Sequence, residues 1–225
     1  MPRNVIIAPG EYYHIYNRGT EKRVIFSSSK DYERFLCLLF LCNSKHSVEV
    51  RRQGRTLAEA VKIDRGQPLV DVCAYCLMPN HFHLLVREVE KDGISRFMQK
   101  LTTGYTMYFN KRHDRTGALF QGKYKAGHAN TDSYLRYLVS YIHLNPIKLI
   151  DSRWKEVGIK DHRKAENYLA DFRYSSYLDY LNQDRVENVV INKMALPKYF
   201  DGAGSFKDLV TEWLKWRRSN LGQKK

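Results

Sequence analysis

The sequence predicts an α+β fold, in which a βαββαβ unit forms an antiparallel sheet with helices on one face. Two patterns support this prediction. Short stretches rich in β-branched, aromatic or alternating apolar residues are typical of strands, and longer stretches between them have apolar residues at helical spacing. They follow one another in the order strand, helix, strand, strand, helix, strand, and a further helix comes next.

The first strand is predicted over residues 12–19, where YYHIYNRG is rich in β-formers and closes on a turn signal. A helix is predicted over 31–43, because Ser28 or Ser29 can cap it and its apolar residues recur on one face. The polar and basic segment 44–68 is predicted to be a loop or a mobile insertion.

Two strands come next, over 69–77 and 81–88, joined by a short turn that contains Pro and Asn. Gly93 opens the second amphipathic helix, and a fourth strand is predicted over 122–129. The helix that follows can start at Thr131 or Asp132 and must end near Asn145, because Pro146 disfavours helical geometry in the residue before it. The first six elements have the order of a ferredoxin-like fold.

The charge of the chain indicates a polyanionic partner. Its 225 residues include 38 Lys and Arg against 24 Asp and Glu, a formal net charge of +14, with 16 Tyr and 10 Phe. Cations on phosphates release counterions and aromatic faces stack on bases, so nucleic acid is favoured. The longest apolar run, 35–42, is too short to span a membrane. We expect a cytoplasmic protein with no secretory signal and no membrane partner.

Cys73 and Cys76 form a C-x-x-C pair within a predicted strand. Because their offset is odd, they are expected to point to opposite faces of the strand. A zinc site would also need a second closely spaced ligand pair, and Cys37 and Cys42 lie in a predicted helix. We therefore predict buried free thiols rather than a zinc or redox site.

His81 and His83 are the strongest candidates for chemistry. Residues two apart on a strand project from the same face, so both imidazoles point one way and could hold a divalent metal. Alone, such a pair is more often two ordinary histidines. Tyr141 and Asn145, four residues apart on one helical face, could add a phenol and an oxygen ligand, but the tyrosine could equally belong to a buried stripe. His143 could be structural or a secondary contact.

Six stretches of the sequence, taken in order, resemble the REP-associated tyrosine transposases. These are relatives of the IS200/IS605 transposases within the HUH single-strand endonucleases. The resemblance covers residues 12–181, and the pairing of MPNHFHLLV with YIHLNP is its most specific part. The stretches are YHIYNRG, IFSSSKDYERFLCLL, CAYCLMPNHFHLLV, GALFQGKYKA, YLVSYIHLNPIK and YSSYLDYL.

The resemblance implies a role for each candidate. Tyr141 falls on the nucleophile, His81 and His83 on the metal-binding pair, and Asn145 on the third ligand, where the IS200/IS605 branch has Gln. The implied cofactor is Mg²⁺ or Mn²⁺. The implied reaction is cleavage of single-stranded DNA by tyrosine attack, which leaves a free 3′-OH and a 5′-phosphotyrosine that can rejoin strands in DNA transposition. The family binds hairpins of repetitive extragenic palindromes and acts as monomers or homodimers.

Basic residues around the second helix and the fourth strand are candidates for DNA phosphate contacts. Any one of them could instead belong to an ordinary solvated surface. They are Arg96, Lys100, Lys111, Arg112, Arg115, Lys123 and Lys125.

The resemblance also suggests a division of the chain. Residues 1–150 are predicted to form the catalytic domain, with 44–68 as a basic insertion longer than is usual in the family. Residues 151–225 are predicted to be a partly helical extension packed on the core. Its last helix is expected over 206–218, where it carries Trp213 and Trp216.

Three rival functions remain open. The first is a non-catalytic module that binds structured DNA or RNA, although such a module has no need for the full set of candidate site residues. The others are a zinc or redox protein built on Cys73 and Cys76, and a metal-dependent hydrolase that uses water as its nucleophile. If Tyr141 is not the nucleophile, Tyr137 is the next candidate.

Overall fold

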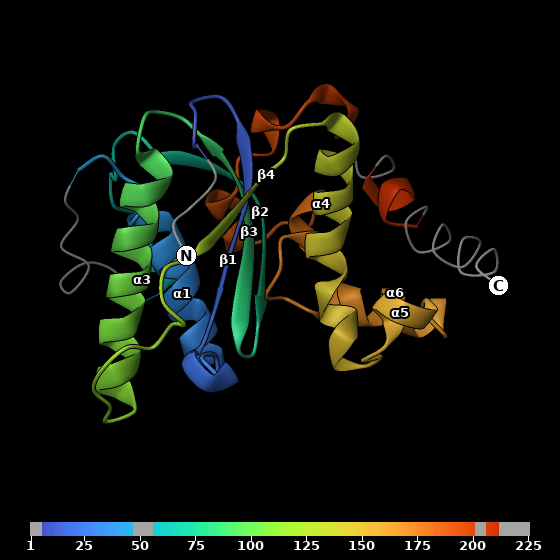
Figure 1. The fold of residues 1–225 in the computed structure, drawn as a ribbon, viewed down its shortest axis with the longest axis horizontal. Helices are drawn as coiled ribbons and strands as arrows, with labels where there is room; N and C mark the ends of the chain where they lie inside the picture. Colours follow the sequence, from blue (N-terminus) through green and yellow to red (C-terminus); the bar gives the residue numbers. More distant parts are fainter. Residues whose placement is uncertain (1–5, 47–55, 201–205, 212–225) are drawn as a thin grey trace.

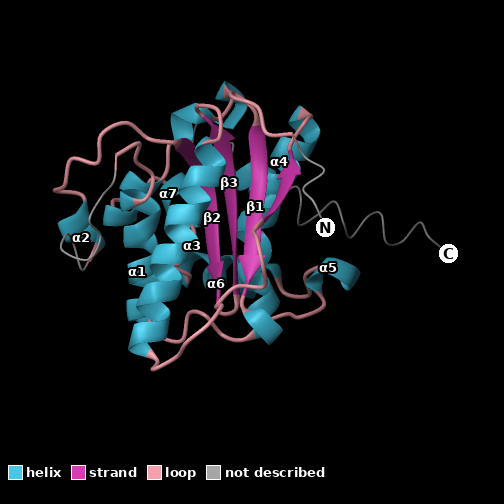
Figure 2. Cartoon of the chain, turned by 60° about the vertical axis from the view of Figure 1, so that its left-hand side comes forward, coloured by secondary structure: helices cyan, strands magenta, loops and turns pink. Residues whose placement is uncertain are grey.

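A four-stranded antiparallel sheet forms the centre of the structure, a computed structural model that describes residues 6–46, 56–200 and 206–211. Its strands and long helices are β1 (Tyr12–Arg18), α1 (Ser29–Leu41), β2 (Val70–Met78), β3 (His81–Glu88), α3 (Gly93–Arg112), β4 (Lys125–His128) and α4 (Asp132–Leu144). Figure 1 shows α1 and α3 on one face of the sheet and α4 on the other, and Figure 2 shows α1 and α3 side by side.

The strands pair in the order β2-β3-β1-β4. This is the order of a ferredoxin-like sheet, and it confirms the predicted α+β class. Pro79 and Asn80 form the tight turn between β2 and β3. The carbonyl of Asn80 accepts a hydrogen bond from the Gly19 N–H at 2.9 Å, and that of Pro79 accepts one from Ile25 at 2.8 Å. The hairpin is thereby tied to the segment that leaves β1.

Helix α1 begins at Ser29 because Ser28 and Asp31 form a capping box. The Asp31 carboxylate accepts hydrogen bonds from the backbone N–H groups of Ser27 at 2.9 Å and Ser28 at 3.0 Å. The carboxylate thus satisfies two backbone N–H groups just before the helix, and the capping box confirms that a serine caps α1 as predicted.

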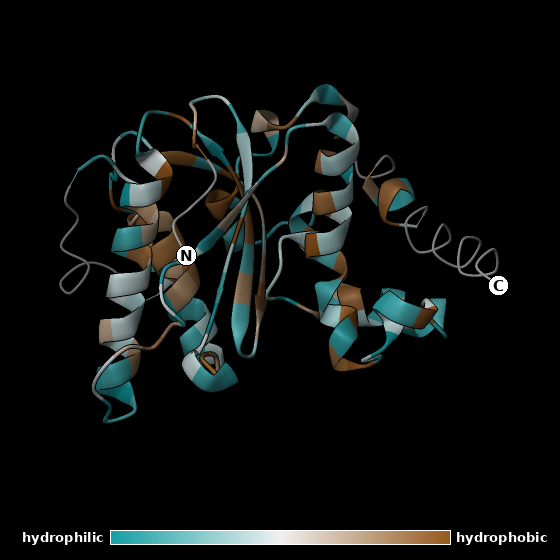
Figure 3. Ribbon diagram, in the orientation of Figure 1, coloured by the Kyte–Doolittle hydropathy of each residue, from teal (hydrophilic) through white to brown (hydrophobic). Residues whose placement is uncertain are grey.

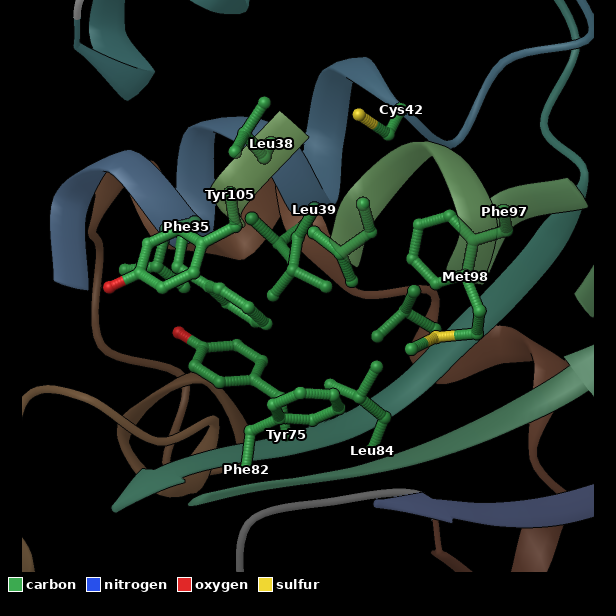
Figure 4. Packing of buried hydrophobic residues seen from close by; sticks show 14 of the residues in the cluster. Phe35, Leu38, Leu39, Cys42, Tyr75, Phe82, Leu84, Phe97, Met98 and Tyr105 are labelled. Atoms are coloured by element: carbon green, nitrogen blue, oxygen red, sulfur yellow. The ribbon is translucent and has the colours of Figure 1, made fainter. Parts of the chain in front are cut away.

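Two apolar cores lie on the two faces of the sheet. Phe82 and Leu84 of β3 pack with Phe35 and Tyr105 in the core beneath α1 and α3 (Figure 4). Leu85, the next residue of β3, belongs to the other core, beneath α4. Figure 3 shows that apolar residues of α1 and α4 gather on the sides that face the sheet. The alternation along β3 therefore assigns each of its side chains to one layer.

A β-bulge in β2 changes the predicted orientation of the cysteines. Val72 pairs with Val86 and Ala74 with Leu85, so the residue between them, Cys73, has no cross-strand partner. The extra residue shifts the alternation of faces along β2 by one, so that Cys73 and Cys76 both join the core beneath α4. The expectation that they face opposite sides is wrong. Both are buried free thiols, as are Cys37 within α1 and Cys42 at its C-terminal end.

The segment 44–68 is not simply a loop, because it contains the short helix α2 (Leu57–Ala60). Thr56 and Glu59 form a capping box around its first turn, and Leu57 is only 3% exposed. The guanidinium of Arg65 connects the segment to α1, because it donates a hydrogen bond to the Phe40 carbonyl at 3.1 Å. A predicted mobile insertion is therefore anchored at these points, while residues 47–55 lie outside the described part.

After α4 the chain continues in short helical turns along the sheet. The carbonyl of Tyr174 accepts from the Leu77 N–H at 2.9 Å, and the Asn192 N–H donates to Val72 at 2.8 Å, so this part pairs with β2. Within the described residues, no helix has the length and apolarity needed to cross a bilayer. The turns are η2 (Asn145–Leu149), α5 (Trp154–Val157), α6 (His162–Asp171), α7 (Tyr177–Tyr180), η3 (Val186–Val190), η4 (Lys193–Ala195) and η5 (Lys198–Phe200); η1 (Thr20–Lys22) follows β1.

Residues 206–211 are helical, where the last helix was predicted, and Phe206 is fully buried. The predicted Trp213 and Trp216 lie outside the described residues. The division of the chain at residue 150 stays a prediction.

His143 has a structural role in the core beneath α4. Its Nδ1 donates to the Val139 carbonyl at 2.8 Å, and its Nε2 accepts from the Ser176 hydroxyl at 2.7 Å. Burial lowers its pKa to about 4 from the ordinary value of 6.5. Because the pKa of His143 is lower in the folded state than in the unfolded state, acidification favours unfolding. The free energy of unfolding is at its full value above pH 6.5 and falls by about 3 kcal/mol in all as the pH drops toward 4.

We therefore expect the free energy of unfolding of the wild-type protein to fall more steeply with acidification than that of His143→Gln. Denaturant titrations at pH 7 and at about pH 4.5 measure both slopes, and the difference should approach the stated value. Histidines elsewhere contribute equally to both proteins and cancel. Parallel pH profiles for the two proteins would contradict this assignment.

Candidate active site

The candidate site lies on the sheet face that is covered by α4. Phe82 points into the opposite core, so His81 and His83 on either side of it project toward α4. Their ring centroids are 5.0 Å apart. His83 is only 6% exposed, whereas His81 is half-buried. The strand thus orients both imidazoles as the sequence pattern predicted.

Helix α4 brings the tyrosine to these rings. The Tyr141 ring meets His83 edge to face, with 5.6 Å between the ring centroids. Asn145 follows directly after α4, and its Nδ2 donates to the Tyr141 carbonyl at 2.7 Å. This hydrogen bond fixes the amide, so that Oδ1 is turned to the ammonium of Lys155. The structure therefore brings together all the residues that were predicted for catalysis and metal binding.

His14 is part of the site although the sequence analysis did not single it out. It lies on β1, and its Nε2 is 2.8 Å from Nδ1 of His83. Burial lowers the pKa of His14 to about 4, so the ring is neutral at pH 7 and its Nε2 can accept a hydrogen bond from the Nδ1–H of His83. That tautomer leaves the lone pair on Nε2 of His83 available for a metal. The alternation of YYHIYNRG places His14 on the correct face, but only the strand register brings it to His83.

The imidazoles of the site are neutral at physiological pH. Burial, followed by nearby positive charges such as Lys148, lowers the pKa of His81 to about 4. Burial also holds the pKa of His83 well below its usual range. Neutral imidazole is the form that ligates metals. Burial raises the pKa of Tyr141 above that of a free phenol, and the charge of Lys148 acts against this rise.

Lys155 is a second residue that the sequence analysis missed. It comes from α5, and its ammonium nitrogen lies 3.1 Å from the Tyr141 hydroxyl and 3.2 Å from Oδ1 of Asn145. Its charge contributes to the lowered pKa values of His14, His81 and His83. The Lys155 ammonium therefore contacts the tyrosine and the amide directly and acts on the histidines through its charge.

The donor atoms fit a divalent cation. Nδ1 of His81 is 2.6 Å from Oδ1 of Asn80, and Nδ1 of His83 bonds to His14, so each ring is held by one nitrogen. Within the described part of the chain, the Nε2 atoms of both rings carry no hydrogen bond. Oδ1 of Asn145 already faces a positive charge. Because no three His, Cys, Asp or Glu side chains form a metal cluster in the described residues, a metal here would need the amide oxygen.

The candidate DNA contacts lie on two different faces. Those on α3 belong to the layer opposite the site, where Arg96 pairs with Glu90 at 2.8 Å and Arg112 with Asp31 at 3.3 Å. Lys125 on β4 pairs with Tyr16, on the face of the site. The remaining members engage as follows: Lys100 donates to the Ser44 carbonyl at 2.6 Å, Arg115 to Asn110 at 2.5 Å, and Lys111 and Lys123 are exposed.

Comparison with known proteins now identifies the class. The profile of a family described as “Transposase IS200 like” matches residues 12–145, more than half of the chain. The chain belongs to this family of transposases, which are enzymes that act on DNA. The resemblance indicated by the sequence motifs is thereby confirmed.

Among solved structures, the fold is similar to that of a REP-associated tyrosine transposase bound to a REP hairpin. The TM-score is 0.52 at 12% sequence identity, over 83% of this chain and 90% of that chain. At this identity the likeness concerns the fold alone. A tRNA(His) guanylyltransferase from Saccharomyces cerevisiae aligns over 88% of this chain and 86% of its own at 12% identity, but its TM-score of 0.37 carries no argument. The curated proteins give no match.

Proposed function

We propose that this transposase is a REP-associated tyrosine transposase that cuts and rejoins single-stranded DNA beside hairpins. In this proposal Tyr141 is the nucleophile, and His81, His83 and Asn145 hold a divalent metal. The observation that carries the proposal is the convergence of a phenolic hydroxyl, an amide oxygen and two neutral imidazoles on one side of the sheet. A pure DNA-binding module has no need for that convergence.

The reaction is a transesterification. The phenolic oxygen of Tyr141 attacks phosphorus and loses its proton, while the bond from phosphorus to the 3′ oxygen breaks and that oxygen takes up a proton. The products are a free 3′-OH and a 5′-phosphotyrosine. Since the phosphodiester is conserved in the covalent link, a 3′-OH can attack it and join strands without ATP. If water were the nucleophile, the reaction would stop at cleavage and the strands could not be rejoined without a further source of energy.

The chain supports this chemistry in two ways. His14 fixes the tautomer of His83, and the hydrogen bond to the Tyr141 carbonyl fixes the amide of Asn145. A bound Mg²⁺ or Mn²⁺ would supply Lewis acidity that draws charge from the phosphate oxygens. Imidazole ligands suit Mn²⁺ better than Mg²⁺, which prefers oxygen.

The substrate is proposed to be single-stranded DNA that carries a hairpin of the REP type. The family acts on DNA, the fold is that of a protein solved with a REP hairpin, and the net charge of +14 favours phosphates. Lys125 lies on the face of the site, where Arg18 and Lys148 add positive charge near His81. The DNA contacts of the seven predicted cations stay a prediction, and those on α3 could serve only DNA that extends to the opposite face.

The proposal is tested with the full chain, a labelled single strand that carries a hairpin, and Mn²⁺. We expect a protease-sensitive covalent adduct on a denaturing gel, together with a shortened strand that ends in 3′-OH. Both products should vanish when EDTA removes the metal. Hairpin binding without any adduct would contradict the proposal and favour the non-catalytic module for structured DNA or RNA.

A further inference from the structure

Lys155 occupies a central place in the site although it follows the family-matched segment. It lies on α5, next to Trp154, whose side chain is only 2% exposed and packs in the core beneath α4. The carbonyl of Trp154 accepts from the Gly158 N–H at 3.0 Å and closes the short turn. The indole therefore anchors the backbone from which the lysine reaches the site.

The ammonium of Lys155 contacts the side chains of Tyr141, on α4, and of Asn145, directly after it. It donates to the hydroxyl oxygen of Tyr141 at 3.1 Å and to Oδ1 of Asn145 at 3.2 Å. The same nitrogen lies 4.2 Å from the centroid of the Tyr141 ring, within the range of a cation–π interaction. These contacts hold the phenol at its oxygen and at its ring, so the direction of the nucleophile depends on Lys155.

We infer that Lys155 is a further catalytic residue, whose fixed positive charge stabilises negative charge on the phenolic oxygen of Tyr141 during strand cleavage and strand joining. This inference rests on the proposed function. In cleavage, the oxygen loses its proton as its bond to phosphorus forms. In joining, a 3′-OH loses its proton as its oxygen bonds to phosphorus, while the phenolic oxygen leaves with the electron pair of the broken bond and takes up a proton.

The lysine needs to transfer no proton in either direction. Its ammonium nitrogen, 3.1 Å from the hydroxyl oxygen, acts as a preorganised donor at an atom whose negative charge grows in both transition states. Tyr141 is half-buried, and a phenolate that is partly removed from water is more costly than one in water. The positive charge of Lys155, within hydrogen-bonding distance of the phenolic oxygen, offsets that cost.

The test compares Lys155→Met with the wild-type chain on a labelled single strand that carries a hairpin, with Mn²⁺ present. Single-turnover rates are measured for cleavage at saturating protein, and for joining from the isolated covalent adduct. Both rates should fall by about 10²-fold, because an oxyanion donor is removed. The dissociation constant for the hairpin should change by no more than about threefold, since binding is spread over many phosphate contacts.

Two further variants separate catalysis from structure. Lys155→Arg keeps a charged donor and should recover both rates to within about tenfold of the wild type. Lys160→Met removes an exposed lysine from the same segment and should leave the rates unchanged. Circular dichroism melting checks that each variant is folded.

The outcomes are distinct. Cleavage by Lys155→Met at the wild-type rate would overturn this role alone, and so would a defect that arginine does not relieve or that is matched by lost hairpin binding. A wild-type chain that forms no adduct would overturn the proposed function, and this role with it.

Discussion

Tyr141→Phe is expected to lower the rates of cleavage and of covalent adduct formation by at least about 10³-fold relative to the wild type. Phenylalanine keeps the ring that packs against His83 at 5.6 Å and His14 at 5.8 Å between centroids, but it lacks the oxygen that attacks phosphorus. The lost hydrogen bond from Lys155 should cost about 1 kcal/mol of stability, so the variant remains folded. Denaturing gels measure the adduct, and a mobility-shift assay should show unchanged hairpin binding.

Tyr137→Phe is the matched control. Its ring lies one turn earlier on α4 and stacks on Tyr141 at 5.6 Å between centroids, so it tests loss of a hydroxyl next to the site. This variant should form the adduct at close to the wild-type rate. An adduct that persists in Tyr141→Phe would move the nucleophile to Tyr137. Cleavage without an adduct would instead support a metal-dependent hydrolase that uses water.

His81→Ala is expected to weaken Mn²⁺ binding by at least about 100-fold and to remove cleavage in parallel. Without this ring, only the His83 imidazole and the neutral amide of Asn145 remain as proposed ligands. His81 is the first residue of β3 and is half-buried, so alanine there leaves the two cores intact. Isothermal titration with Mn²⁺ measures the loss of affinity independently of activity.

His128→Ala provides the control for that experiment. His128 belongs to the same sheet, but its Nε2 lies 2.8 Å from Glu11 and its ring stacks on Tyr13, which packs in the opposite core. Its removal should leave the affinity for Mn²⁺ unchanged. Equal affinities of His81→Ala and the wild type would contradict the proposed ligand set.

The sheet was predictable because its signals are local. Alternation along YYHIYNRG and HFHLLV, a short turn between two apolar runs and a serine cap before α1 each depend on few neighbouring residues. The bulge at Cys73 was not predictable, since an extra residue in a uniformly apolar strand breaks no pattern. Helix α2 was missed because its Thr56 and Glu59 capping box lies inside a polar stretch that resembles a loop.

The site divides in the same way. Strand alternation and the four-residue spacing on α4 indicated His81, His83, Tyr141 and Asn145, and the family resemblance supplied their roles. His14 needed the pairing of β1 with β3, because its partner lies 69 residues away in sequence. Lys155 had no sequence signal, since its contact depends on how a four-residue helix packs after α4.

Backbone hydrogen bonds join β2, an edge strand of the sheet, to residues that lie on both sides of α7 in the sequence. The Ser176 N–H donates to the Tyr75 carbonyl at 3.0 Å, in line with the bonds that Leu77 and Val72 make to the same part of the chain. A polypeptide that stopped at residue 150 would leave these groups bare, as a template on which strands from other molecules can assemble. By pairing with this edge, Tyr174, Ser176 and Asn192 block strand addition from other molecules, and the same third of the chain carries Lys155, which contacts Tyr141.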